Sequence, residues 1–151
     1  MSPTDTIAAV ASGWGYSRWG LIRLSGPQTP DLVRTLVLAG PTDQPAGRGP
    51  TAWLVSVAGF RLDDSHVLPC RTIIYAAPRS FTGEPVAELL VPGNPIILER
   101  VMARLTAHPG VREAEPGEFS ARAYLNGKLT REQAEGLAAA IAAGSAAQLA
   151  E

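Results

Sequence analysis

Short apolar runs, some alternating with polar positions, occupy the first two-thirds of the chain. Residues 21–26 (LIRLSG) alternate apolar and polar, which predicts a half-buried strand with Arg23 and Ser25 on one face. Other apolar and β-branched runs predict strands over residues 5–11, 52–60, 67–76 and 86–91. Segments rich in glycine and proline predict loops over residues 12–20, 40–50 and 78–85.

Apolar positions with helical spacing appear between the predicted strands and in the last third of the chain. Residues 31–38 show this spacing, with Thr29 as a possible N-cap. A second helix is predicted to begin after Asn94, a natural N-cap, and to end at Pro109. We expect a short helix over residues 117–127.

A final helix is predicted to begin after Thr130, where Gln133 completes a capping box, and to run towards the C-terminus. Strands and helices therefore mix without a regular strand–helix–strand alternation. This pattern favours an α+β fold with a mixed, mainly antiparallel sheet flanked by helices, and a C-terminal helix.

Composition limits the classes of function. The chain has 151 residues, of which 46% are hydrophobic and 18% charged, as expected for one domain or one domain with an extension. Its net charge of −1 excludes a generally basic nucleic-acid binder. One cysteine and two histidines exclude a disulfide framework and leave little for a metal site. We see no targeting signal or membrane-spanning run, so we expect a cytoplasmic protein without membrane contact.

Several motifs have a purely structural interpretation as well as a functional one. The loop at residues 12–20 carries Trp14, Tyr16 and Trp19, which either stack on a ligand or cover a sheet edge as a hairpin. His66, after two aspartates, is interpreted as part of a solvated turn, and Cys70 as a buried free cysteine. No GxxxxGK[ST] motif is present, so we expect no GTP on this chain.

Three charged residues occupy distinctive positions. Arg23 interrupts an apolar strand, Glu84 lies in a glycine-containing loop at the entrance of a strand, and Lys128 follows Asn-Gly. Lys128 is also the only lysine among the 13 basic residues. Each alone is typical of a surface charge. The sequence segments around the three residues are more specific for one family when they are taken together.

Four segments resemble one family over nearly the whole chain. They are DTI at residues 5–7, IRLSG at 22–26, PRSFTGE at 78–84 and PGEFSARAYLNGKL at 116–129, followed by QAE at 133–135. Together they are similar to the N-terminal domain of the MnmE/TrmE tRNA-modification GTPases.

The resemblance implies a fold, a ligand and partners. It implies a folate-binding-like domain over residues 1–128, similar to the tetrahydrofolate-binding domain of that family and of aminomethyltransferases, and a helical extension over 129–151. It implies a homodimer that binds a reduced folate, such as 5-formyl- or methylene-tetrahydrofolate. A flavoprotein partner and, indirectly, tRNA are implied as well.

The family's folate-contacting residues correspond by motif to Arg23, Glu84 and Lys128. A pterin presents a ring N–H and a 2-amino group side by side, and one carboxylate can accept both, which suits Glu84. Arg23 and Lys128 suit the carbonyl, one-carbon or glutamate-tail oxygens of the ligand. This chain by itself is not expected to be a catalyst, since the family's GTPase domain is not within it.

Departures from the family pattern keep other functions open. Tyr16 replaces an arginine, Pro85 replaces an aspartate, and Pro92 lies in a motif that has lost its histidine. The leading interpretation is a folate-binding and dimerisation module related to tRNA wobble-uridine modification. The alternatives are a degenerate dimerisation or scaffold protein without a ligand, and a stand-alone folate-dependent transferase, which no evident acid–base pair supports.

Overall fold

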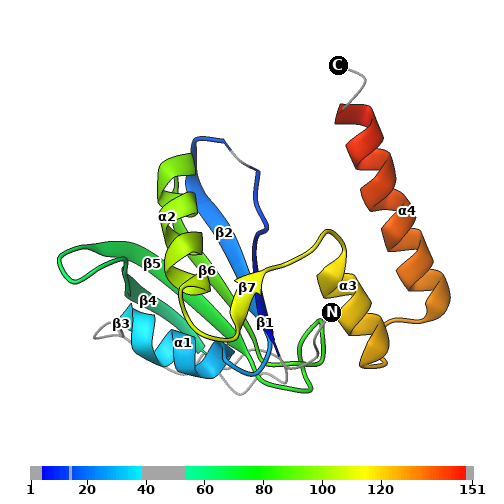
Figure 1. Cartoon of the computed structure of the whole chain (residues 1–151), viewed down its shortest axis with the longest axis horizontal. Coiled ribbons are helices and arrows are strands. Elements are labelled where there is room, and N and C mark those ends of the chain that lie inside the picture. Colours follow the sequence, from blue (N-terminus) through cyan, green and yellow to red (C-terminus); the bar gives the residue numbers. More distant parts are fainter. Residues whose placement is uncertain (1–4, 14, 39–53, 149–151) are drawn as a thin grey trace.

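The computed structural model describes residues 5–13, 15–38 and 54–148. Within them, one seven-stranded sheet has the order β3-β4-β5-β6-β2-β1-β7 (Figure 1). The strands are β1 (Thr6–Val10), β2 (Ser17–Ser25), β3 (Val37–Leu38), β4 (Leu54–Arg61), β5 (Val67–Tyr75), β6 (Val86–Gly93) and β7 (Val111–Glu113). The helices are α1 (Thr29–Leu36), α2 (Pro95–Thr106), α3 (Glu118–Leu125) and α4 (Arg131–Gln148). Neighbouring strands are antiparallel except β1 and β7, so the mixed, mainly antiparallel α+β fold is confirmed.

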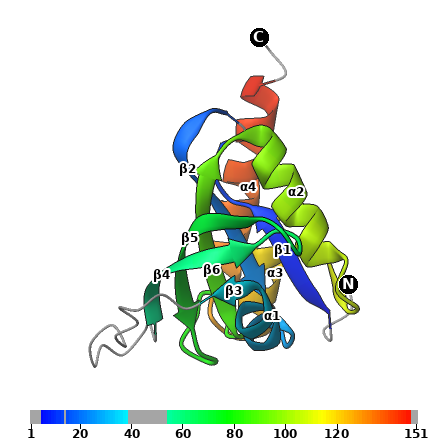
Figure 2. The same cartoon turned by 90° about the vertical axis from the view of Figure 1, so that its left-hand side faces the viewer.

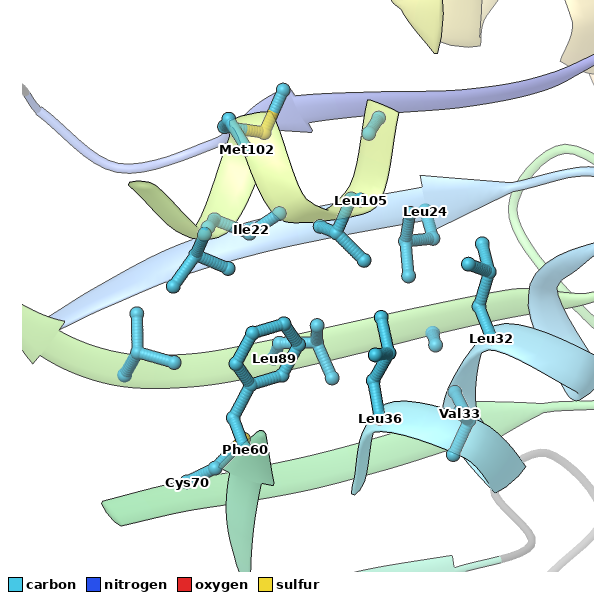
Figure 3. Packing of buried hydrophobic residues seen from close by; sticks show 14 of the residues in the cluster. Ile22, Leu24, Leu32, Val33, Leu36, Phe60, Cys70, Leu89, Met102 and Leu105 are labelled. Carbon is cyan, nitrogen blue, oxygen red and sulfur yellow. The ribbon is translucent and has the colours of Figure 1, made fainter. Parts of the chain in front are cut away.

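One face of the sheet carries the hydrophobic core. Alternate residues of the central strands, such as Ile22 of β2 and Leu89 of β6, point to this face and are fully buried. Helices α1 and α2 cover it, and their side chains, including Leu36 and Leu105, pack onto the strands (Figures 2 and 3). Burial of these side chains away from water is the main source of stability.

The opposite face holds the intervening residues of the same strands. Arg23 pairs in register with Glu88, Leu21 with Leu90, and Ile73 with Glu88. All five side chains are partly exposed. This face is therefore mixed in character, whereas the face under α1 and α2 is apolar.

Two predictions of helix capping are confirmed. Asn94 caps α2, since its Oδ1 accepts the backbone N–H of Ile96 at 2.9 Å. The capping box of α4 is formed: the Thr130 N–H donates to Gln133 Oε1, and the Gln133 N–H donates to Thr130 Oγ1. No helix among the described residues is long and apolar enough to cross a membrane.

Other boundaries were wrong. The strand predicted from residue 21 begins at Ser17, because Ser17 still pairs with Gly93 across an irregularity in the register. The first helix begins at Thr29 rather than being capped by it, and ends before Val37, which joins a short strand against β4. Strand β7 was not predicted, since three residues are too few to show alternation. The loop predicted over residues 40–50 lies outside the described residues.

The turn after β2 requires a glycine. Gly26 has a φ of +133°, and a Cβ placed there would lie 2.7 Å from the Cα of Thr6. We expect Gly26→Ala to lower the free energy of unfolding by roughly 3 kcal/mol, through backbone strain and a contact with rigid main chain. Urea denaturation measures the change.

Gly136→Ala is the matched control. A Cβ at this position in α4 meets nothing within 4 Å, and alanine favours helix more than glycine does. This variant should therefore be as stable as the wild type or more so. Equal stabilities for the two variants would contradict the constraint at Gly26.

Candidate functional site

Glu84 lies at the end of the loop that connects β5 to β6, and hydrogen bonds hold its carboxylate. The Ser25 hydroxyl, from the end of β2, donates to Oε2 at 2.7 Å. Nη1 of Arg122, from α3, is 3.2 Å from each oxygen. The side chain keeps 17% of its surface exposed. The carboxylate is thus fixed by protein donors and still reaches solvent.

Arg23 lies on the partly exposed face of the sheet, paired with Glu88. Its Nε and Nη2 donate to Glu88 Oε1 at 3.0 and 2.7 Å. Tyr75 donates to the other Glu88 oxygen at 3.4 Å, and burial, together with Glu88, raises the pKa of the Tyr75 hydroxyl. A pocket of about 420 Å³ opens here, lined by Arg23, Tyr75, Phe81, Val86 and Glu88.

Lys128 follows α3 and lies against the same loop. Its Nζ donates to the Pro78 carbonyl at 2.9 Å, and its stem passes over Gly83. A Cβ on Gly83, whose φ is +79°, would meet Asn126 Cβ at 3.0 Å and Lys128 Cγ at 3.4 Å. Glycine at this position therefore lets the loop pack closely against the segment after α3.

The loop over residues 76–85 is the feature that the three expected residues share. Glu84 belongs to it and Lys128 holds it, while Arg23 shares the pocket with Phe81 of the same loop. Glu84 and Lys128 are not among the residues that line that pocket. Each of the three side chains has a protein partner in this structure.

A buried ionic network lies beneath Glu84. Glu118 of α3 is fully buried and accepts Nη1 and Nη2 of Arg112 at 2.8 and 2.6 Å. Arg122 adds two longer contacts to the same carboxylate, and Arg112 also reaches Asp5. The paired arginines, above all Arg112, lower the pKa of Glu118 to about 2, although burial opposes this shift.

The sequence patterns did not predict a role for four residues near these side chains: Phe81, Glu88, Glu118 and Arg122. The spacing of Glu118 and Arg122, four residues apart in a predicted helix, was a usable signal of an ion pair. The pairing of Arg23 with Glu88 had no such signal, because 65 residues separate them and only the strand register brings them together.

The other residues singled out in the sequence are the aromatic residues of the loop at residues 12–20, His66 and Cys70. The Arg71 guanidinium lies 5.4 Å from the centre of the Trp19 ring, within the range of a cation–π contact. His66 contacts Asp63 in an exposed turn, and Cys70 is buried and unpaired. Trp14 lies outside the described residues. Within those residues, no three potential metal ligands gather.

The known proteins that this chain matches belong to one family. Residues 6–128 match the family model described as "GTP-binding protein TrmE N-terminus". The chain is 42% identical over 147 residues to the tRNA modification GTPase MnmE of Sodalis glossinidius, covering 97% of this chain and 30% of that protein. It is 40% identical over 152 residues to MnmE of Hyphomonas neptunium, covering 100% of this chain and 33% of that protein. The chain thus spans about a third of the length of these relatives.

The buried network makes stability depend on pH. Because the pKa of Glu118 is about 2 in the fold against an ordinary value of 4.5, ionised Glu118 stabilises the fold by about 3 kcal/mol at neutral pH. This contribution is complete above about pH 4.5 and is lost as pH falls towards 2. We expect Glu118→Gln to be strongly destabilised at pH 7, with a smaller deficit at pH 3.

Urea denaturation at both pH values tests this expectation. Glu99→Gln, at an exposed position of α2, provides the control and should follow the wild type at both. A deficit for Glu118→Gln that does not change between pH 7 and pH 3 would contradict the assigned role of the carboxylate.

Proposed function

The chain belongs to the TrmE N-terminal family, and from this we propose that it is a reduced-folate-binding and dimerisation module related to tRNA wobble-uridine modification. The observation that carries the proposal is the Glu84 carboxylate, which protein donors fix at the edge of a pocket-bearing sheet face. The family match supports the link to tRNA modification, since the relatives are named as tRNA modification GTPases.

Glu84 suits the pterin end of the ligand. A carboxylate has about four acceptor sites, and the Ser25 hydroxyl and one Arg122 nitrogen do not use them all. Two neighbouring N–H donors of a pterin can therefore pair with its exposed side. Such charge-assisted pairs are stronger and more directional than neutral ones.

The pocket suits a planar ring and polar oxygens. Phe81, which is 44% exposed, and Tyr75 provide aromatic surface, which favours stacking on a flat heterocycle. The pair with Glu88 uses Nε and Nη2 of Arg23, and no described residue accepts from its Nη1. We assign Arg23 to a ligand oxygen and Lys128, which is exposed, to the glutamate tail.

A second candidate is a dimerisation or scaffold protein that has lost its ligand. The specific observation in its favour is that every proposed ligand contact already has a protein partner: Arg122 for Glu84, Glu88 for Arg23, and the Pro78 carbonyl for Lys128. A reduced folate must share or displace these partners. Binding measurements therefore separate the two candidates.

We place the domain boundary near residue 128. Helix α4 stands away from the sheet, contacts mainly α3, and has exposed side chains over most of residues 131–141 (Figure 1). Residues 1–128 are proposed as the folate-binding-like domain, and 129–151 as a helical extension. We propose that a flavoprotein partner and, indirectly, tRNA interact with the assembled protein. We expect that this chain does not itself bind GTP.

Dimerisation is proposed through the partly exposed face of the sheet. Leu21, Ile73 and Leu90 are apolar, lie on neighbouring strands and remain partly exposed. Pairing this face with that of a second copy would remove apolar surface from water without disturbing the core under α1 and α2.

Folate binding is tested by calorimetric titration of the purified chain with 5-formyl-tetrahydrofolate. We expect Glu84→Ala to weaken binding about ten- to a hundredfold or more, because two donors lose one charged acceptor. Lys128→Ala should cost less, because solvent screens an exposed charge pair.

Glu99→Ala is the matched control, since it removes an exposed glutamate from α2 on the other side of the sheet. It should bind as the wild type does. Absence of any heat or thermal shift with wild-type protein at high ligand concentration would reject folate binding and leave the scaffold function.

Assembly is tested by light scattering at micromolar concentration. We expect the wild type to be a dimer and Leu90→Arg to be a monomer, because the variant places a charge in the proposed interface. Ile96→Arg replaces an exposed apolar residue of α2 and should remain dimeric. A monomeric wild type, or a dimeric Leu90→Arg variant, would exclude this interface.

A further inference from the structure

Arg122 is a buried arginine that the motif comparison did not assign to the ligand site. Its side chain is 4% exposed. Nη1 donates to the Asp5 carbonyl at 2.8 Å and to both oxygens of Glu84, while Nε and Nη2 donate to Glu118 at 3.4 and 3.1 Å. The guanidinium thus connects the proposed ligand carboxylate to the interior of the domain.

We propose that Arg122 is a positioning residue: it sets the plane of the Glu84 carboxylate for the paired N–H donors of a pterin-like ring. The inference rests on the proposed function, because it concerns how the same carboxylate recognises its ligand. It adds a specificity-determining residue that does not itself touch the ligand.

The geometry at Glu84 supports a positioning role. The last torsion of a glutamate side chain is broad and has no strong preference, so a free carboxylate rotates readily. Nη1 of Arg122 lies 3.2 Å from both oxygens and is thus centred between them, and Ser25 then holds Oε2 from a second direction. Two donors at different angles define the plane. Pre-setting that plane lowers the entropic cost of a two-point contact.

Arg122 is itself held independently of Glu84. The Asp5 carbonyl and Glu118 accept its other N–H groups, and Arg112 in turn fixes Glu118 with two shorter hydrogen bonds. The Glu118 carboxylate is therefore already paired with one arginine, Arg112, when the contact to Arg122 is left aside. The additional arginine is better explained by what it does to Glu84 than by the pairing of Glu118.

Lysine cannot replace Arg122 in this role. A guanidinium presents planar, fixed donors in several directions, whereas an ammonium is a compact charge on a flexible stem. Arg122→Lys therefore keeps the charge near Glu84 and Glu118 and removes the fixed donor geometry. Arg112→Lys is the matched control, since it weakens the same buried network without a contact to Glu84.

The test compares two ligands on each variant by calorimetry. One is 5-formyl-tetrahydrofolate, and the other is the analogue in which methyl replaces the 2-amino group, so that one donor to Glu84 is lost. For wild type and for Arg112→Lys we expect a preference of about tenfold or more for the first ligand. For Arg122→Lys we expect the preference to fall to about twofold, because the carboxylate no longer meets both donors together.

Each outcome decides between the explanations. If Arg122→Lys keeps the full preference, or if Arg112→Lys loses it equally, Arg122 is a structural residue and the inference is wrong. If the wild type binds neither ligand, the proposed function is rejected, and this inference with it. Loss of the preference in Arg122→Lys alone supports positioning, since a purely structural defect would weaken both ligands alike.

A measurement on the wild type covers the case in which Arg122→Lys does not fold. The Nη1–H signals of Arg122 and Arg112 are followed by nuclear magnetic resonance during titration with 5-formyl-tetrahydrofolate. We expect the signal of Arg122 to shift and that of Arg112 to stay, because only Arg122 contacts the carboxylate that meets the ligand. Equal shifts, or no shift at Arg122, would contradict the inference.

Discussion

The guanidinium of Arg122 joins three parts of the molecule that are far apart in the sequence. It donates to the backbone at the start of β1, to Glu118 within its own helix, and to Glu84 in the loop before β6. A buried charge is costly unless it is paired and hydrogen-bonded, so each of these acceptors helps to stabilise the guanidinium in the interior. The position of α3, and of the loop that it supports, follows from this requirement.

The two faces of the sheet differ in character. The face under α1 and α2 is filled with apolar side chains and provides the core. The other face carries the ion pair of Arg23 with Glu88, a pocket and partly exposed apolar residues. Because neighbouring residues of a strand point to opposite faces, the same strands provide both the apolar and the polar face. A change in the polar face therefore need not disturb the core.

Gly83 shows how closely the loop over residues 76–85 is packed. Gly83 takes a conformation that other residues rarely adopt, and the stem of Lys128 lies directly beside it. Asn126 also holds this loop, since its amide donates to the Thr82 carbonyl at 2.7 Å. The loop that carries Glu84 is thus fixed from α3 and from the segment after it. A family motif that spans these residues has a physical basis in this packing.

The sequence by itself determined the type of most elements, the mainly antiparallel α+β fold and the family. Alternation, capping residues and turn residues are local signals, and the helix after Asn94 and the capping box at Thr130 were therefore predictable. Only the tertiary structure decided the partners of Arg23 and Glu84. Arg23 meets Glu88, and Glu84 meets Arg122, across 65 and 38 residues. Such pairs depend on strand register and helix placement, which many distant contacts set jointly, and no local pattern encodes them.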